Sequence, residues 1–405
     1  MKDEKKAPKL RFKGFTDDWE QRKLGDVCEP ITDSIDTQKY PNEVFAEYSM
    51  PAFDASMKPD IVLGSSMNSV RKIITRPCLL VNKLNVRKKR IWYVKKPNKN
   101  AVCSAEFIPL YSDTVDLTFL NQVAKSETFT RYLENHSSGS SNSQKRITPR
   151  SLMLSKLHIP TIEEQKLIGK IFESLDHTIT LHEEKKRQLE RLKSALLKKM
   201  FADKSGYPAV RFEGFGGKWD QCKLGNVGTF RGGFGFPENE QGNIDGIAFY
   251  KVSDMNDSCN TLTMRKASNY VTSSQISKNK WKPILNQNII FAKVGAAVYL
   301  ERKRKAMGPF LLDNNMMAFQ PKDADIDYIY YVFQRLRISK HAQVGTLPSL
   351  NASELRNITI YIPSLNEQKA VADLMVSLDH TIILYDFKLE LLKKLKSSLL
   401  QHMFI

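Results

Sequence analysis

Two segments of this chain each occur twice, about 200 residues apart. The segment PKLRFKGFTDDWEQRKLGDV (8–27) returns as PAVRFEGFGGKWDQCKLGNV (208–227), with 11 of 20 positions identical. The longer segment 159–201 returns as 362–404, with 21 of 43 positions identical. A period this long excludes a solenoid, whose units span roughly 20–50 residues. The chain is therefore a duplication, in which a constant frame is repeated around intervening sequence.

The two intervening segments, 28–158 and 228–361, share little sequence. Both combine runs rich in branched and aromatic residues, typical of strands, with amphipathic stretches typical of helices. We therefore predict two unlike α/β (α+β) domains in equivalent positions. The predicted strands are 78–84, 90–94 and 288–295, and the predicted helices are 117–136 and 326–342.

Each long repeat begins with Ile-Pro and a residue pattern that starts a helix. Thr161 with Glu164, and Ser364 with Glu367, have the spacing of a capping box, in which a hydroxyl and a carboxylate bond the first backbone amides. A proline disfavours helical backbone at the residue before it. We therefore expect two helix starts, framed by the residues Pro160, Glu164, Pro363 and Glu367.

Both predicted helices carry apolar residues at spacings of three and four, from Ile168 to Met200 and from Val371 to Met403. This pattern, which includes Leu192 and Leu395, is that of a coiled-coil seam. Neither helix can bury such a stripe alone. We predict that the two pair with each other, antiparallel, and join the two domains in a pseudo-two-fold arrangement.

Two polar residues interrupt the first seam, and the antiparallel pairing would place His182 and Lys186 near Leu389 and Tyr385. They either fix the register of the pair or extend to solvent.

The net charge of +18 over 405 residues indicates a polyanionic partner, of which nucleic acid is the commonest. Five scattered cysteines without a CxxC pair argue against disulfides and structural zinc, and fit a reducing cytoplasm. No apolar run approaches the roughly 18 residues of a membrane span, and the first residues lack the apolar core of a secretory signal. We expect a cytoplasmic protein that binds double-stranded DNA and does not bind a membrane.

Basic residues concentrate around and after the central predicted strand of each insert. Lys83 and Lys293 occupy equivalent positions, and a basic run follows each of them. Such residues position a protein on phosphates but read no sequence. The predicted phosphate contacts are Lys83, Arg87, Lys88, Lys89, Arg90, Lys293, Arg302, Lys303, Arg304 and Lys305.

Reading bases requires amide or fork-shaped donors in a groove of the duplex. Polar loops at 136–146 and 343–351, together with a polar turn near residue 314, supply such side chains. The predicted base contacts are Asn142, Gln144, Arg146, Asn314, Asn315 and Asn351. Asn351 with Glu354 is also a capping signal for a short helix.

The motifs PxxRFxGF…W…KLG, IP-x₃-EQK and SLDHTI, each present twice around dissimilar inserts, resemble the specificity subunit of type I restriction–modification enzymes. The resemblance covers the whole chain. It implies two target recognition domains, each reading one half of an interrupted DNA site, and conserved helices that set the spacing and dock two methyltransferase subunits. Two motor–nuclease subunits complete the implied complex, and the cofactors AdoMet, ATP and Mg would be bound by the partner subunits. The implied segments are 1–158 (leading segment and first recognition domain), 159–207 (central helix and linker), 208–361 (leading segment and second recognition domain) and 362–405 (C-terminal helix).

Catalytic patterns are weak in this sequence. The motifs NPPY and DPPY, typical of base methyltransferases, do not occur. The glycines of FRGGFGF (230–236) lack the third glycine of GxGxxG, which favours a turn over a cofactor loop. Glu164-x-Lys166 and Glu367-x-Lys369 resemble the end of a nuclease signature, but capping explains both glutamates. We therefore predict a non-catalytic chain without a metal site.

The repeated Asp-His pairs at 176–177 and 379–380 suggest an acid–base pair, but adjacent helical residues point about 100° apart. We expect them instead to contact the opposite helix or a partner. Trp19 and Trp219 are predicted to be packing anchors for the two leading segments.

Two other classes of function are compatible with these patterns. One is a structural adaptor whose paired helices hold two proteins together while its charge is incidental. The other is a self-sufficient nuclease or methyltransferase. Affinity for duplex DNA separates the first from a recognition subunit, and turnover by the isolated chain identifies the second.

Overall fold

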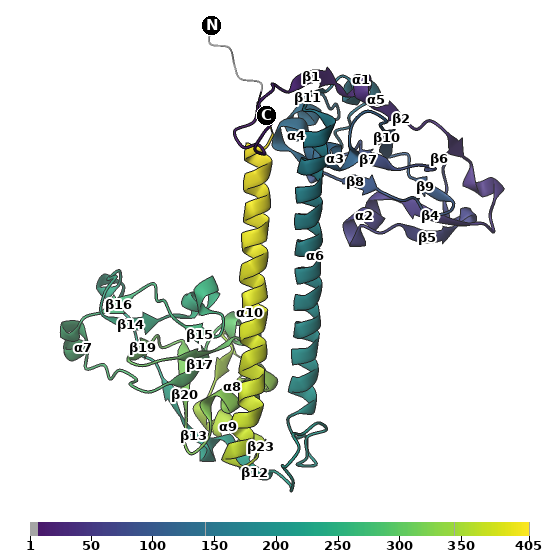
Figure 1. Cartoon of the computed structure of the whole chain (residues 1–405). Coiled ribbons are helices and arrows are strands. Elements are labelled where there is room, and N and C mark those ends of the chain that lie inside the picture. Colours follow the sequence, from purple (N-terminus) through teal and green to yellow (C-terminus); the bar gives the residue numbers. More distant parts are fainter. Residues whose placement is uncertain (1–6, 142, 344, 405) are drawn as a thin grey trace. The chain divides into compact units, whose positions relative to one another are not determined.

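The computed structural model describes residues 7–141, 143–343 and 345–404. The chain divides into two compact units. Unit 1 comprises residues up to Glu184 together with those from Phe387 onward, and unit 2 comprises Lys185–Asp386. Each unit holds one insert, its leading segment and parts of both long helices (Figure 1).

Unit 1 contains two sheets in its insert and a hairpin-like strand pair in its frame. The frame pair joins the leading segment to the strand before the long helix, in antiparallel register. The strands, in spatial order, are β1(Glu20–Lys23)-β11(Lys156–Ile159), then β2(Glu29–Pro30)-β10(Phe107–Tyr111)-β7(Cys78–Asn82)-β8(Ile91–Val94), and β3(Ser34–Ile35)-β6(Arg71–Ile73)-β9(Ala101–Cys103)-β4(Val44–Tyr48)-β5(Asp60–Leu63).

The predicted single helix over 117–136 is two helices, α3(Leu117–Lys125) and α4(Glu127–Asn135). Ser126 between them has extended backbone, and its hydroxyl accepts a hydrogen bond from the amide of Phe129 at 3.2 Å. Serine at such a position caps a new helix, which is why the chain turns there. The other short helices of unit 1 are α1(Leu24–Val27), α2(Met50–Ser56) and α5(Pro149–Met153), and its 3-10 turns are η1(Thr37–Lys39), η2(Gly64–Ser66) and η3(Val86–Lys88).

Unit 2 has a similar arrangement of strands, but the strands at the edges of its sheets differ from those of unit 1. Its strands, in spatial order, are β12(Asp220–Lys223)-β23(Thr359–Ile362), then β13(Gly228–Gly232)-β20(Met316–Pro321)-β17(Asn288–Ala292)-β18(Lys303–Ala306)-β15(Thr263–Met264), with β16(Tyr270–Val271)-β14(Ile247–Tyr250)-β19(Phe310–Leu312) and the pair β21(Ala342–Gln343)-β22(Ser349–Leu350). Its short helices are α7(Ser273–Asn279), α8(Ile326–Arg335) and α9(Ala352–Arg356), and its 3-10 turns are η4(Leu224–Asn226), η5(Glu238–Glu240), η6(Val252–Asn256), η7(Ser258–Asn260), η8(Ala296–Leu300) and η9(Ile338–His341). The predicted helix 326–342 therefore ends at Arg335.

The strands that precede Lys83 and Lys293 occupy equivalent central positions in the two units, as the matched lysines suggested. Strand β7 lies between β10 and β8, and β17 lies between β20 and β18, all antiparallel. The predicted strands at 78–84, 90–94 and 288–295 are confirmed by β7, β8 and β17. The prediction of two α/β domains on one frame is thus correct.

The leading segment of each unit is anchored by its tryptophan, as predicted. Trp19 and Trp219 are 1% and 3% exposed. Trp19 packs edge-on against Phe119 of α3, and Trp219 packs edge-on against Tyr328 of α8. These contacts join each frame to its insert.

The two repeats each form one long helix, α6(Ile162–Lys199) and α10(Leu365–His402). Within unit 1, Lys396 binds Asp176 at 2.5 Å and Lys393 binds Glu183 at 2.6 Å. Higher numbers on one helix thus meet lower numbers on the other, as in an antiparallel pair.

Unit 2 shows the same antiparallel pairing. There Lys186 binds Asp386 at 2.6 Å and Lys193 binds Asp379. The predicted antiparallel pairing is therefore confirmed within each unit. Lys186 does not simply extend to solvent, because its ammonium is held by a carboxylate of the opposite helix.

The seam differs from the prediction at one matched position in each helix. Leu192 and Leu395 are 46% and 48% exposed. Their neighbours Lys193 and Lys396 face the other helix instead and bind Asp379 and Asp176. The aspartates of the two SLDHTI motifs thus bind across the helix pair, which confirms the expected contact with the opposite helix.

The ends of the chain support a circular arrangement of the two repeats. The amide of Leu10 donates to the carbonyl of His402 at 2.9 Å, and that of Val210 donates to Lys199 at the same distance. Each leading segment therefore begins beside the end of a long helix, whether or not a peptide joins them.

We expect a circular permutant, opened in residues 202–207 and with the two ends of this sequence joined by the same six residues, to fold. Its thermal unfolding midpoint should match that of the natural chain within a few degrees, because the Val210–Lys199 contact can form without the covalent link, as the Leu10–His402 contact does. Loss of cooperative unfolding in the permutant would contradict this circular organisation.

Candidate nucleic-acid interface

The glutamate of each IP-x₃-EQK motif is a buried ion-pair partner. Glu164 is fully buried, and both of its oxygens accept from Arg11 at 2.9 and 2.7 Å. Glu367 binds Arg211 in the same way at 2.8 and 2.7 Å. The amide of Glu164 donates to Thr161 Oγ1, as a capping box requires. The carboxylate of Glu164 binds Arg11, however, and not the first backbone amide of the helix. Capping therefore does not explain these glutamates, and the predicted box was wrong in that half.

The glutamine of the motif connects the frame to the insert. Gln165 donates to the carbonyl of Pro160 and accepts from the amide of Asp116, the N-cap of α3, both at 2.9 Å. Gln368 makes the same two bonds, to Pro363 and from Asp325, the N-cap of α8. Pro160 and Pro363 are buried at these joints. The frame residues therefore hold each insert in place.

Most of the basic run in unit 1 is neutralised within the unit. Arg87 and Lys89 bind Glu134 and Glu127 of α4. The guanidinium of Arg90, 8% exposed, binds Asp54 of α2 at 2.7 and 2.5 Å. Their placement is explained by attachment of the two helices to the sheet. Lys88 is exposed.

The basic run of unit 2 is used in the same way. Lys305 binds Asp327 of α8, and Arg302 donates to Asn256 of η6. Lys303 is 2% exposed and binds Glu301 and the carbonyl of Leu336 at the end of α8. Arg304 donates to the carbonyl of Asn260 at 2.5 Å.

Burial and pairing shift the pKa of several of these groups. Burial lowers the pKa of Lys303, and the neighbouring Glu301 partly offsets that effect. Burial also lowers the pKa of Arg304. Conversely, the hydrogen bond to Asp54 raises the pKa of Arg90. Phosphate contact by any of the ten basic residues stays a prediction. For Arg90 and Lys303 it would require a buried cation to leave its carboxylate partner.

Several predicted residues of unit 1 meet at the end of strand β7. The backbone of Lys83 donates to Glu106 at 2.8 Å and accepts from Ile147 at 3.0 Å. Arg146 lies beside Leu84 in an isolated β-bridge. Gln144 is exposed in the same loop and accepts from Ser140 at 2.7 Å. We call Lys83, Glu106, Gln144 and Arg146 the first strand-end site.

The same meeting occurs at the end of strand β17. The backbone of Lys293 donates to Asn315 at 2.7 Å and accepts from Leu350 at 2.8 Å. Ser349 lies beside Val294 in an isolated bridge, and Asn314 is exposed next to Asn315. We call Lys293, Asn314, Asn315 and Ser349 the second strand-end site. The dissimilar loops 136–146 and 343–351 therefore return to equivalent places.

One predicted base contact has a structural role. Asn351 caps α9, and its side-chain oxygen accepts from the amide and hydroxyl of Ser353, both at 3.0 Å. This confirms the capping prediction. Asn142 lies outside the described residues. Base contact by the remaining candidates stays a prediction.

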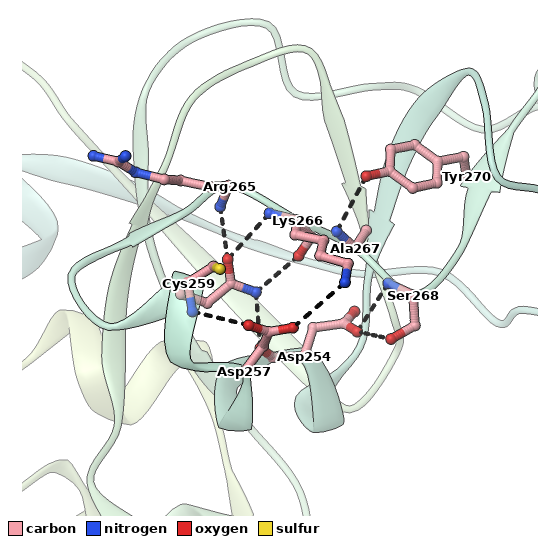
Figure 2. Close-up of polar contacts among 9 residues, drawn as sticks. Asp254, Asp257, Cys259, Arg265, Lys266, Ala267, Ser268 and Tyr270 are labelled. Carbon is pink, nitrogen blue, oxygen red and sulfur yellow. Dashed lines mark hydrogen bonds and ion pairs between the residues drawn. The ribbon is translucent and has the colours of Figure 1, made fainter. Parts of the chain in front are cut away.

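Sequence reasoning missed a loop in unit 2, between η6 and β16, that is held by a network of hydrogen bonds. The buried side chain of Asn260 accepts from the amides of Arg265 and Lys266 and donates to the carbonyls of Asp254 and Lys266. Asp254 Oδ1 accepts from the amide and hydroxyl of Ser268 (Figure 2). The side chain of Arg265 points away from this network, and it is exposed. An Asp-x-x-Asp spacing at 254–257 was the available signal.

The glycine-rich segment FRGGFGF is structural. Its first residues form strand β13, which pairs with β20. A Cβ at Gly233 would lie 2.1 Å from the carbonyl oxygen of Asp313, so only glycine permits this approach. Close packing therefore accounts for Gly233 without a cofactor.

The described residues contain no group of three or more His, Cys, Asp and Glu side chains placed to hold a metal ion. In the same part of the chain, no helix has the length and apolar character to cross a membrane.

Comparison with known proteins bears on both repeats. The family described as "Type I restriction modification DNA specificity domain" matches residues 16–191 and 216–394. The HindI specificity subunit of Haemophilus influenzae is 26% identical over 189 residues, 46% of this chain and 41% of that protein. The MjaVIII specificity subunit of Methanocaldococcus jannaschii is 23% identical over 266 residues, 60% of each chain. The chain thus matches less than two thirds of the length of either relative.

Solved structures show the same fold. A type I restriction–modification S subunit from M. genitalium aligns with a TM-score of 0.62 at 15% identity, covering 98% of this chain and 99% of that one. A chain from a structure of type I R-M complex assembly aligns with a TM-score of 0.51 at 18% identity, covering 94% and 96%. Since the two family matches include both inserts and most of both long helices, this chain belongs to the family of type I restriction–modification DNA specificity domains.

Proposed function

We propose that this chain is the DNA-recognition subunit of a type I restriction–modification complex. In this proposal each insert reads one half of an asymmetric, bipartite site on double-stranded DNA. The observation that carries it is the pair of family matches, each enclosing an insert of different sequence on the same frame. Two unlike surfaces in equivalent positions suit two unlike half-sites, and the charge of +18 suits a phosphate backbone.

The helix pair has two proposed roles, to set the separation of the half-sites and to dock two methyltransferase subunits. Half-sites about one helical turn apart, roughly 10–10.5 bp, present equivalent groove faces. Bases between them would be spanned and sensed only through the deformability of the duplex. Two motor–nuclease subunits would complete the complex.

Chemistry is proposed to reside in the partners. AdoMet would be bound by the methyltransferase subunits, and ATP and Mg by the motor–nuclease subunits. The residues of this chain that resemble catalytic motifs support that division, because Glu164, Glu367, Asp176 and Asp379 are all engaged in ion pairs of the frame.

Adding this chain to its methyltransferase subunits should make DNA methylation sequence-dependent, with all modified positions within one interrupted motif. The measurement is genome-wide mapping of methylated adenines in cells with and without the chain. Methylation that is independent of the chain, or without a common motif, would contradict the proposal.

A salt titration of binding to duplex DNA separates this function from that of an adaptor. A chain that contacts Z phosphates loses affinity with a logarithmic slope of about −0.9Z. An adaptor would show no measurable affinity at any salt concentration. Turnover by the isolated chain with AdoMet or a divalent metal would instead indicate an enzyme.

A further inference from the structure

The two strand-end sites share one backbone arrangement but carry different side chains. Glu106 precedes β10 and accepts from the amide of Lys83, and Asn315 precedes β20 and accepts from the amide of Lys293. These two residues therefore occupy the same structural position. Their side chains are a carboxylate in unit 1 and a carboxamide in unit 2.

A second position varies in the same way. Arg146 bridges to Leu84, and Ser349 bridges to Val294, each one residue after the matched lysine. The residues that follow, Ile147 and Leu350, donate to the carbonyls of those lysines at 3.0 and 2.8 Å. Position 146 of unit 1 therefore corresponds to position 349 of unit 2. The backbone hydrogen bonds are the same in both units, whereas the side chains at these positions differ.

In unit 1 Glu106 orients Arg146 but binds only one of its side-chain nitrogens. Arg146 Nη1 donates to both carboxylate oxygens of Glu106, at 2.8 and 2.6 Å. None of the residues described in the structure accepts from its Nε or Nη2. The two side chains are 51% and 26% exposed, so the pair contributes little to stability. Its effect is to hold a guanidinium edge in one orientation at the rim of the sheet.

In unit 2 an amide takes this place. The backbone of Asn315 is fixed, because its amide donates to Asp313 Oδ1 at 2.8 Å and its carbonyl accepts from Lys293. Its side chain is exposed, and within the described part of the chain the carboxamide makes no hydrogen bond. The opposing Ser349 is small enough to leave it accessible.

We propose that these equivalent positions each read one base pair: Arg146, oriented by Glu106, reads guanine, and Asn315 reads adenine. This inference rests on the proposed function. Guanine presents two acceptors, O6 and N7, to the fork of an arginine, and adenine presents a donor and an acceptor, N6 and N7, to a carboxamide. Because different side chains occupy equivalent positions in the two units, the two half-sites that they read would differ.

The test is selection from a random duplex DNA library by the chain assembled with its methyltransferase subunits. Arg146→Ala should relax one G·C position in one half-site, with a loss of discrimination of about tenfold or more. Asn315→Ala should relax one A·T position in the other half-site by a similar factor. Each variant should leave the opposite half-site unchanged.

Conservative variants separate base reading from charge and folding. Arg146→Lys keeps the cation but loses the fork, so the salt slope should remain while discrimination is lost. Asn315→Asp keeps the shape but cannot donate to adenine N7, and should also lose discrimination. Arg76→Ala, which removes an exposed arginine paired with Asp113, and Asn366→Ala on α10 are matched controls that should select the natural sequence.

The outcomes distinguish this inference from the function on which it depends. If the natural chain selects no common sequence, the proposed function is wrong. If it selects a bipartite sequence and the Arg146 and Asn315 variants select the same one, the function stands and these residues are not readers. Thermal unfolding midpoints equal to that of the natural chain exclude misfolding as the cause of any change.

Discussion

Replacing Arg211 by alanine should destabilise unit 2 by about 3–5 kcal/mol, since it leaves a buried carboxylate without its partner. Glu367 is 3% exposed and accepts both of its hydrogen bonds from Arg211. The same arginine also donates to the carbonyls of Gly216 and Gly217, so its loss detaches the leading segment from the start of α10. Arg11→Ala should act in the same way on unit 1, where the pair is with Glu164.

Hydrogen exchange resolved by unit, together with denaturant unfolding, measures this effect. The control is Arg22→Ala, which removes an exposed pair with Glu20 and should leave stability nearly unchanged. The double variant Arg211→Met with Glu367→Leu removes both charges and should recover most of the loss. If Arg211→Ala costs no more than Arg22→Ala, these motif residues do not hold the frame together.

Exchanging residues 228–361 for the corresponding segment of another family member should change one half of the methylated sequence and leave the other half intact. Each mismatched base pair costs about 1–3 kcal/mol, so the original half-site should disappear from the methylation map. The reason is that the frame contacts lie mainly outside the exchanged segment, in Arg211, Glu367 and the joints around Pro363.

The exchanged segment must retain the residues that contact the frame. The amide of Asp325 donates to Gln368, and Tyr328 packs against Trp219 and stacks on Phe201. A donor without a capped helix and an inward aromatic side chain at that place should fail to fold. The reciprocal exchange of residues 28–158 is the control and should change the opposite half-site. Alteration of both halves by either exchange would contradict modular reading.

Local patterns were sufficient wherever one segment decides its own structure. The central strands β7 and β17, the cap of α9 by Asn351 and the two long helices follow from runs of branched and aromatic residues, capping residues and heptad spacing. Ser126 is a residue type that caps helices, but the amphipathic pattern continues across residues 117–136 and therefore predicted one helix where the structure has two. The pairing of the two helices was predictable because each stripe needed a partner of equal length.

The candidate site was less predictable, because the partner of a charge is set by distant segments. Arg90 and Lys303 were predicted to contact phosphate, yet they are 8% and 2% exposed. Arg90 binds Asp54 of α2, and Lys303 donates to the carbonyl of Leu336 at the end of α8. The matched basic runs proved to be attachment points for helices of each unit. The clustering of Arg146 with Glu106, and of Asn315 with Ser349, depends on loops returning to the sheet, which no local pattern describes.

The sequence by itself determined the duplication, the family and the antiparallel helix pair, because repeated motifs and periodic apolar residues are properties of the chain alone. Only the tertiary structure decided what the repeated glutamates, glutamines and basic residues do. Their energies come from burial and from partners on other elements of the fold, and for the glutamates Glu164 and Glu367 those partners are arginines 153 and 156 residues away. Long-range packing also brings a few exposed polar side chains together at the ends of β7 and β17. They lie at positions with the same backbone hydrogen bonds in both units.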